Sequence, residues 1–486
     1  MSFAYKTSGL AVAVALALTA CSFGPSGEPP AMASPEHYGA QAQPPRTVAA
    51  GGVAQQFDIG ATSVPQWWRL YRSDALDGLV EEGLQNSPTL MATQRTLAAA
   101  QEELRAQVGA STMPSIDGTA QVQRARSPVV PGLGPQQVQY NYFAGQLVAS
   151  YNFDLFGQTR YANKASAARV NVQAYQLEAA RRALAANIVG TAISVATLDR
   201  QIALTERLVA VANEAANEDQ QRYALGSVSR AQALASTQDA ASVAAALPAL
   251  RQQRASAVHA LAVLMGRTPD NAPAVPDLDS LALPEHVPVA VPSDLLRSRP
   301  DIQAADAAVK AAAADVGAAT AQLFPSLSLT GSMGRGGFSW PALLSGAGGL
   351  WAIGAGLSQP IFHGGALFAQ RRASIDTYDA AVLHYKSTVL SAFQDVANSL
   401  DALDNDAQTL ASTEAAAQAA RAAFDDTVAR HRIGSLPSTA QHASEQRFLN
   451  AQLSSVRATG QRMSDTAALF QAMGEPPADQ KAASTK

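Results

Sequence analysis

Hydrophobic residues follow two different periods along this chain, a period of two in short runs and a heptad period in long ones. The short alternating runs fall into two pairs, and each run is at least about 10 residues long, which is the length that a tilted strand needs to cross a bilayer. We therefore predict strands at about residues 114–124 and 138–154, and again at about 325–334 and 350–360.

Four strands are too few for a closed transmembrane barrel, because such barrels need about eight or more. Either the two hairpins pack on a helical core away from lipid, or several copies of the chain pool their strands. The second alternative predicts that the protein must oligomerise.

The heptad runs predict helices much longer than those of ordinary globular domains. No proline occurs from Gly157 to Tyr223, a span of about 67 residues that would be roughly 100 Å long as a helix. Globular helices average about 11–12 residues. Apolar positions step by alternating four and three residues from Leu184 to Val209, and again from Val389 to Leu410. Such a seam predicts helices that coil left-handedly around their neighbours.

The whole pattern occurs twice. The turn Arg222-Tyr223-Ala224-Leu225-Gly226-Ser227 returns as Arg430-His431-Arg432-Ile433-Gly434-Ser435, and Gly266 and Gly474 follow these turns at the same spacing. Each copy consists of a helix, two strands, a long helix, a glycine turn and a return helix. The predicted boundaries are 67–267 for repeat 1, with its long helix at 157–223 and return helix at 229–265, 268–292 for a proline-rich linker, and 293–474 for repeat 2, with its long helix at 364–431 and return helix at 438–473.

The N-terminal residues predict export and lipidation. Residues 1–20 have the pattern of a signal peptide, with an apolar run that is too short to span a bilayer. The run ends in Leu18-Thr19-Ala20-Cys21, which resembles a bacterial lipobox, and Cys21 is the only cysteine, so no disulfide can form within the chain. We expect residues 21–66 to form a lipidated, extended tail and residues 475–486 to form a loose C-terminal tail.

Composition argues against several classes of function. The 486 residues carry a net charge of −4, which is too balanced for nucleic acid to be the expected partner. The seven histidines are dispersed without metal-ligand spacing, and no Gly-x-Ser-x-Gly motif occurs. Asp401, Asp404 and Asp406 are expected on the solvated surface of a helix. We therefore predict no enzyme activity, no metal and no cofactor, apart from the covalent lipid on Cys21.

Three further motifs stand at the junctions of the predicted elements. Tyr151-Asn152-Phe153-Asp154-Leu155-Phe156-Gly157 joins a strand to a long helix, Ser298-Arg299-Pro300-Asp301-Ile302-Gln303-Ala304-Ala305 opens repeat 2, and Phe324-Pro325-Ser326-Leu327-Ser328-Leu329-Thr330-Gly331 begins a strand. Together with the lipobox and the paired Arg-x-x-x-Gly-Ser turns, their order and spacing resemble the TolC-like outer-membrane factor family, specifically its NodT/OprM branch of outer-membrane efflux lipoproteins.

The resemblance implies a mainly α fold with a β-barrel part. Three protomers would each contribute four strands to one 12-stranded outer-membrane β-barrel, and their long coiled-coil helices would form a periplasmic α-barrel. The protein would then be a homotrimer, lipid-anchored in the outer membrane of a Gram-negative bacterium and extending into the periplasm. Its partners would be a periplasmic membrane-fusion adaptor, an inner-membrane transporter reached through that adaptor, and outer-membrane lipid.

The two glycine turns are candidates for an adaptor-docking tip, because such turns form the periplasmic tip in the family that the chain resembles. Judged from their residues alone, they are ordinary helix–helix turns with a C-cap glycine and an N-cap serine. The docking candidates are Leu225, Gly226, Ser227 and Val228 in the first turn and Ile433, Gly434, Ser435 and Leu436 in the second.

Residues on either side of the turns are candidates for a closed aperture. Family members often carry acidic residues just beyond the turns, whereas residues 229–234 and 438–443 contain no carboxylate. We therefore expect a neutral or mildly basic constriction. The aperture candidates are Tyr223, Arg230, Gln232, His431, Gln441 and His442.

The function that the resemblance implies is the exit duct of a tripartite efflux pump, which passively conducts drugs or other small molecules once the adaptor opens the tip. Two alternatives stay open. One is the exit duct of a type I protein-secretion system, and the other is a lipid-anchored periplasmic scaffold that does not conduct. The lipobox favours small-molecule efflux over protein secretion.

Overall fold

The computed structural model of the chain describes residues 23–32, 35–39, 44–61, 64–126, 139–345 and 348–474. The expected signal peptide, the lipidation site Cys21 and the C-terminal tail at 475–486 lie outside the described residues. Within the described part of the chain, none of the helices combines the length and the apolar composition needed to span a membrane.

The chain divides into two compact units, each assembled from separated stretches of sequence. The first unit is made of residues 1–30, 96–173 and 304–385, and the second of residues 31–95, 174–303 and 386–486. Both repeats contribute to both units. The strands of each repeat belong to the first unit, and its glycine turn belongs to the second.

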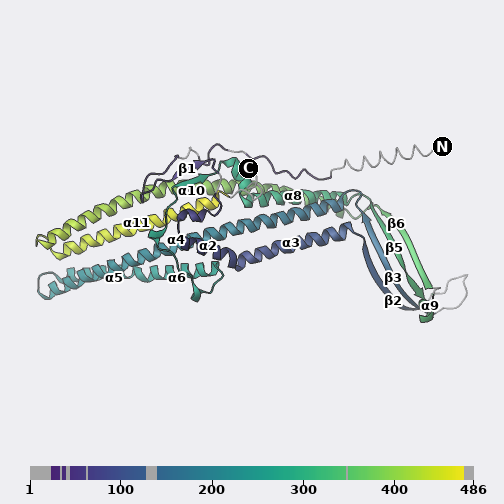
Figure 1. Cartoon of the computed structure of the whole chain (residues 1–486), viewed down its shortest axis with the longest axis horizontal. Helices are drawn as coiled ribbons and strands as arrows, with labels where there is room; N and C mark the ends of the chain where they lie inside the picture. The colour runs from purple at the N-terminus through teal and green to yellow at the C-terminus, as the bar shows by residue number, and fades with distance from the viewer. Residues whose placement is uncertain are drawn as a thin grey trace. The chain divides into compact units, whose positions relative to one another are not determined.

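The first unit contains a four-stranded antiparallel sheet in the order β2-β3-β5-β6 (Figure 1). Its strands are β2 (Ser115–Arg126), β3 (Gln139–Phe153), β5 (Ser326–Gly337) and β6 (Gly349–Ser358). The pairing of β3 with β5 joins the hairpin of repeat 1 to that of repeat 2. Among the described residues, β2 and β6 each pair on one side only, so both outer edges carry backbone groups available to a further strand.

The two faces of this sheet differ in polarity, because the register places most of the apolar residues of all four strands on one side. Leu147 lies opposite Gly118 and Met333, and Met333 lies opposite Trp351. The other face carries mainly serine, threonine, glutamine and glycine. Exposed apolar residues on the first face are Ile116, Val122, Leu147, Phe153, Leu329, Met333, Trp351, Ile353 and Leu357.

The helices include two of 67 residues each, α4 (Gln158–Ala224) and α10 (Ala366–Arg432), which lie within two residues of the expected bounds. The heptad seam from Val389 to Leu410 is buried along almost its whole length. The shorter helices are α2 (Asp74–Asn86), α3 (Pro88–Thr112), α7 (Pro292–Ser298), α8 (Pro300–Ala321), α9 (Trp340–Leu344) and α11 (Ser438–Ala472).

The return helix of repeat 1 is broken, so the expectation of one continuous helix over 229–265 is wrong. The structure has α5 (Arg230–Ala244) and α6 (Ala246–Leu264), separated at Ala245. The cause is Pro248, which has no N–H to donate to the carbonyl of Ala244 and whose ring crowds that carbonyl. The return helix of repeat 2, α11, has no proline within its bounds and is continuous.

The motif before α4 caps that helix. The carboxylate of Asp154 accepts hydrogen bonds from the backbone N–H groups of Thr159 (3.2 Å) and Arg160 (2.9 Å). Gly157 adopts a φ of 82°, which turns the chain from the end of β3 into the helix. The motif therefore fixes the direction in which α4 leaves the sheet, and satisfies helix N-terminal donors that have no partner within the helix.

The motif that opens repeat 2 contains Arg299, whose side chain bonds to several helices. Its guanidinium donates to Asp301 (3.0 and 2.7 Å), to Asp395 on α10 (3.1 Å) and to the carbonyl of Ala472 on α11 (3.0 Å). Burial acts to raise the pKa of Asp301, but the hydrogen bonds and charge of Arg299 outweigh it and hold this pKa below its usual range. The motif thus joins three helices of the second unit.

Part of the N-terminal tail pairs with the linker between the repeats. β1 (Gln56–Ile59) forms a two-stranded parallel sheet with β4 (His286–Val289). The preceding residues surround the guanidinium of Arg462, which is fully buried and donates to the side chains of Gln55 (3.0 Å) and Thr47 (3.0 Å) and to the carbonyl of Ala50 (2.9 Å). This arrangement ties the tail to α11.

One expected surface residue is not on the solvated surface. Asp406 on α10 is half-buried and lies beside Asp465 on α11. Burial and this second carboxylate raise the pKa of Asp406 to about 7, although the nearby Arg462 opposes the shift. Because two carboxylates can share a hydrogen bond only when one of them is protonated, the pair holds a proton in mildly acidic solution.

Candidate functional site: the helical tip

The two turns predicted as a docking tip have the same backbone geometry. At the end of α4, Gly226 has a φ of 74° and donates to the carbonyl of Tyr223 (2.9 Å), while the N–H of Ser227 donates to that of Arg222 (2.8 Å). At the end of α10, Gly434 (φ 77°) and Ser435 make the equivalent bonds at 2.9 Å each. This is the Schellman arrangement, in which a left-handed residue satisfies the last carbonyls of a helix.

Each turn presents one large apolar side chain to solvent. Leu225 is 83% exposed and Ile433 is 79% exposed, and both occupy the position just before the glycine. Val228 and Leu436, which follow the turns, are half-buried. The apices therefore offer a matched pair of apolar contacts.

The helices that follow the turns begin differently. Ser229 is the N-cap of α5, and its hydroxyl accepts a hydrogen bond from the N–H of Gln232 (3.2 Å). Pro437 occupies the N-cap of α11 and makes no such bond. The hydroxyl of Ser438, the first residue of α11, instead donates to the carboxylate of Glu218 on α4.

Glu218 links α4 to α11. Besides Ser438, its carboxylate approaches Nε2 of His442 at 3.5 Å. The His442 side chain is 16% exposed, and its Nδ1 is buried with no hydrogen-bond partner among the described residues. Farther from the turns, Arg207 on α4 makes hydrogen bonds of 3.0 and 2.6 Å with Glu445 on α11, so polar contacts join these two helices at two levels.

Asp219, the next residue, points in a different direction and links α4 to α5. It is buried, accepts a hydrogen bond from the hydroxyl of Ser236, and lies 3.3 Å from the guanidinium of Arg222. Farther from the turn, the alanines Ala212 and Ala216 of α4 pack against Ala240 of α5. The contact between α4 and α11 is filled instead by larger side chains, Leu208, Val211, Leu449 and Leu453. α4 therefore holds α5 and α11 by adjacent carboxylates that point to different partners.

The aperture candidates separate into three groups in the structure. Arg230 and Gln232 are exposed on α5, and Tyr223 is 43% exposed. His431 faces its own turn, where its Nδ1 donates to the carbonyl of Leu436 (2.9 Å). Gln441 and His442 are half-buried on α11, and of the two His442 faces Glu218.

The sequence interpretation missed both carboxylates of this region, because it looked for acidic residues only beyond the turns. Glu218 and Asp219 precede the first turn by less than three helical turns. Their adjacency on α4 was a usable signal, since neighbouring helical residues point about 100° apart and so reach different partners. No cluster of three His, Cys, Asp or Glu side chains suited to a metal ion occurs among the residues that the structure describes.

Comparison with known proteins gives a consistent result over nearly the whole chain. The family model described as "Outer membrane efflux protein" matches residues 79–267 and 291–475, which are the two repeats. The outer membrane protein OprJ of Pseudomonas aeruginosa is 30% identical over 481 residues, covering 96% of this chain and 95% of that protein. The probable efflux pump outer membrane protein TtgC of Pseudomonas putida is 31% identical over 391 residues, or 78% of each chain.

Solved structures agree on the fold. The CmeC outer membrane channel of Campylobacter jejuni superposes with a TM-score of 0.84 at 21% identity, covering 96% of this chain and 98% of that one. The mainly helical architecture with a β part is that of TolC-like channels, and the protein is located in the outer membrane of a Gram-negative bacterium with a periplasmic extension. The chain belongs to the outer membrane efflux protein family, in its OprM/NodT-type group, whose members are channels and not enzymes.

Proposed function

We propose that this protein is the passive exit duct of a tripartite efflux pump, conducting drugs or other small molecules from the periplasm to the exterior. It works as a homotrimer anchored by a lipid on Cys21. Three copies of the four-stranded sheet close one barrel, because pairing then covers both open edges and lipid covers the exposed apolar face.

The tip is the docking site of a periplasmic membrane-fusion adaptor, which couples the duct to an inner-membrane transporter. The observation that carries this proposal is the pair of equivalent turns that expose Leu225 and Ile433. Both hairpins of each chain then offer the same kind of apolar contact, so a trimer offers six quasi-equivalent apices to an adaptor.

Opening of the tip requires the second hairpin to separate from α4. Glu218 opposes this movement, since it holds Ser438 and His442 at the start of α11. Asp219 holds α5 instead, which belongs to the same hairpin as α4. Glu218 therefore makes the polar contact nearest the turns that adaptor binding must break between the hairpins, whereas Asp219 makes none between them.

The docking proposal is tested in a strain that lacks the gene. Wild-type protein should restore low drug accumulation, and the double variant Leu225→Asp and Ile433→Asp should not, because a charge at each apex opposes burial against the adaptor. The control, Leu225→Met with Ile433→Met, keeps the apices apolar and should restore efflux. Full restoration by the aspartate variant, at equal amounts in the outer membrane, would refute docking at the apices.

The same strain separates the alternatives. Loss of secreted proteins from the medium with unchanged drug accumulation would instead identify a protein-secretion duct.

Conductance in planar bilayers tests the contacts of Glu218 with Ser438 and His442, here called the latch. Glu218→Ala should raise the open fraction of the channel several-fold. Glu214→Ala, which removes an exposed carboxylate one turn earlier on α4, should leave that fraction unchanged. A chain that conducts in neither form would point to a scaffold.

A further inference from the structure

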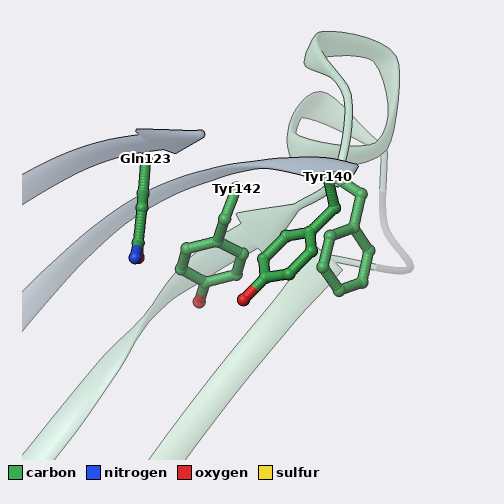
Figure 2. Close-up of a pocket in the computed structure, with 4 residues that line it drawn as sticks. Gln123, Tyr140 and Tyr142 are labelled. Carbon is green, nitrogen blue, oxygen red and sulfur yellow. The ribbon is translucent and has the colours of Figure 1, made fainter. Parts of the chain in front are cut away.

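The polar face of the sheet changes composition at one end, here called the loop end, where β2, β5 and the start of β3 lie together. Along most of its length this face carries serine, threonine, glutamine and glycine. At the loop end three aromatic residues, Tyr140, Tyr142 and Phe338, gather beside Gln123 and line a cavity of about 580 Å³ (Figure 2). That volume is within the range of small-molecule sites.

The four side chains lie on one side of the sheet. Tyr140 and Tyr142 are two residues apart on β3 and so share a face, and Gln123 of β2 is opposite Tyr142 in the register. Figure 2 shows the three labelled side chains pointing to the same side of the strands. The Phe338 ring stands edge-on to Tyr140, with centroids 5.7 Å apart and planes at 87°, and its centroid is 6.0 Å from Tyr142.

The backbone below the cluster makes room for it. A Cβ atom on Gly336 would lie 2.7 Å from Cδ1 of Leu350 and 2.8 Å from the hydroxyl oxygen of Tyr142, so any other residue there would force one or both side chains to shift. Among the described residues, no charged side chain lines the cavity. The two tyrosines are half-buried, whereas the side chain of Phe338 is 66% exposed and so accessible to a solute.

Contact with lipid does not account for these aromatic residues. An aromatic girdle at the membrane surface belongs on the outward, apolar face of a barrel. Phe143 and Trp340 fit that description, since Phe143 shares the face of Leu147 and the two rings lie 4.7 Å apart. Tyr140 and Tyr142 point to the other side of β3, which lines the interior when the apolar face meets lipid.

We propose that Gln123, Tyr140, Tyr142 and Phe338 form a binding site for uncharged aromatic solutes that carry a hydrogen-bonding group. The rings supply stacking and edge contacts, and the phenol hydroxyls and the amide supply donors and acceptors. The inference rests on the proposed function, because it places three copies of the site inside the outer end of the duct. Binding there is weak, as a conducting path requires that a solute also leaves.

The experiment measures binding of 1-naphthol to the full-length protein in lipid nanodiscs by saturation-transfer NMR titration. The double variant Tyr140→Leu and Tyr142→Leu should weaken binding at least about fivefold, since each ring contact contributes about two- to tenfold. Phe143→Leu, on the same strand but the opposite face, is the matched control and should change affinity less than twofold. Cyclohexanol, which has no aromatic ring, should bind much more weakly than 1-naphthol.

Tyr142→Phe separates the two kinds of contact, because it keeps the ring and removes the hydroxyl; we expect an intermediate loss. Equal loss in Phe143→Leu, or wild-type affinity in the double tyrosine variant, would overturn the proposal. Potassium chloride conductance of the same variants is recorded in parallel, with and without Glu218→Ala, because a closed tip alone would block the current. A duct that conducts but binds no 1-naphthol refutes the site alone, whereas absence of conductance in both forms, with specific binding, refutes the duct.

Discussion

The return helices of the two repeats occupy equivalent places in the sequence but very different surroundings in the structure. α11 buries residues from Ser444 to its end, including the charged Arg462 and Glu445. In α5 and α6 only small or aliphatic residues are buried, Ala233, Ala240, Leu261 and Ala262. One copy of the repeat is thus built into the interior of the protomer, while the other leaves most of its return helix available to contacts outside it.

Two arginines make this difference measurable. Arg254 and Arg462 each stand twelve residues before the glycine that ends the repeat, Gly266 or Gly474. Arg462 is fully buried among hydrogen-bond acceptors of the N-terminal tail. Arg254 pairs with Asp199, and both side chains are more than 40% exposed. The same residue type at the same repeat position is therefore structural in one copy and peripheral in the other.

The largest expected effect comes from removing the buried arginine. Arg462→Met should lower the free energy of unfolding by about 3 kcal/mol, because several buried acceptors lose a charged donor at once. Arg254→Met should cost less than about 1 kcal/mol, as exposed ion pairs contribute little. Thermal unfolding followed by circular dichroism compares them, and hydrogen exchange should quicken at residues 44–61 only in Arg462→Met. Equal losses for the two variants would remove the distinction between the repeats.

The sequence predicted the long elements well, because their signals are periodic. Alternation marked all four strands of the membrane-length sheet, and proline-free heptads marked α4 and α10. Pairings between distant segments carry no such period. The parallel pairing of β1 with β4, and the contact of the tail with Arg462, join residues more than 200 positions apart. Nothing in the local sequence of either partner specifies the other.

The tip shows the same division between local and distant signals. Both glycine turns follow from a residue that tolerates positive φ after a helical run, and they were predictable. The break at Ala245 also has a local signal, Pro248, which stands within an alanine-rich helical run. The contact of Glu218 with Ser438 and His442, by contrast, depends on how α4 and α11 are paired in space. Fold class was therefore accessible from one sequence, and the latch was not.

A second prediction concerns pH and again separates the repeats. The folded pKa of Asp406, about 7, lies above that of an ordinary carboxyl, so the folded protein binds more protons than the unfolded chain between about pH 4 and 7. Its contribution to stability is therefore present at low pH and is lost as pH rises through 7. The equivalent position in repeat 1 is Leu198, which cannot titrate.

Asp406→Asn mimics the protonated carboxyl and should raise the unfolding temperature at pH 8 more than at pH 5. Unfolding temperatures measured from pH 5 to 8 for both proteins give the slopes to compare. Asp404→Asn removes a carboxylate from the same helix without touching Asp465, and should leave the slope unchanged. An unaltered slope in Asp406→Asn would show that the pair with Asp465 does not control this pH dependence.

The smallest effect is expected where the return helices begin. Ser229→Ala removes the hydroxyl that accepts from the N–H of Gln232, which should cost about 1 kcal/mol and fray the first turn of α5. Pro437→Ala at the equivalent position removes no side-chain hydrogen bond, and Ser438 still holds Glu218, so α11 should keep its first turn. Hydrogen exchange at residues 230–233 and 438–441 measures the fraying of the two helix starts, and should quicken only at 230–233 in Ser229→Ala.

Because a cap acts within one turn, drug efflux should respond to Ser229→Ala far less than to Glu218→Ala. A comparable response would mean that the first hairpin also moves when the tip opens.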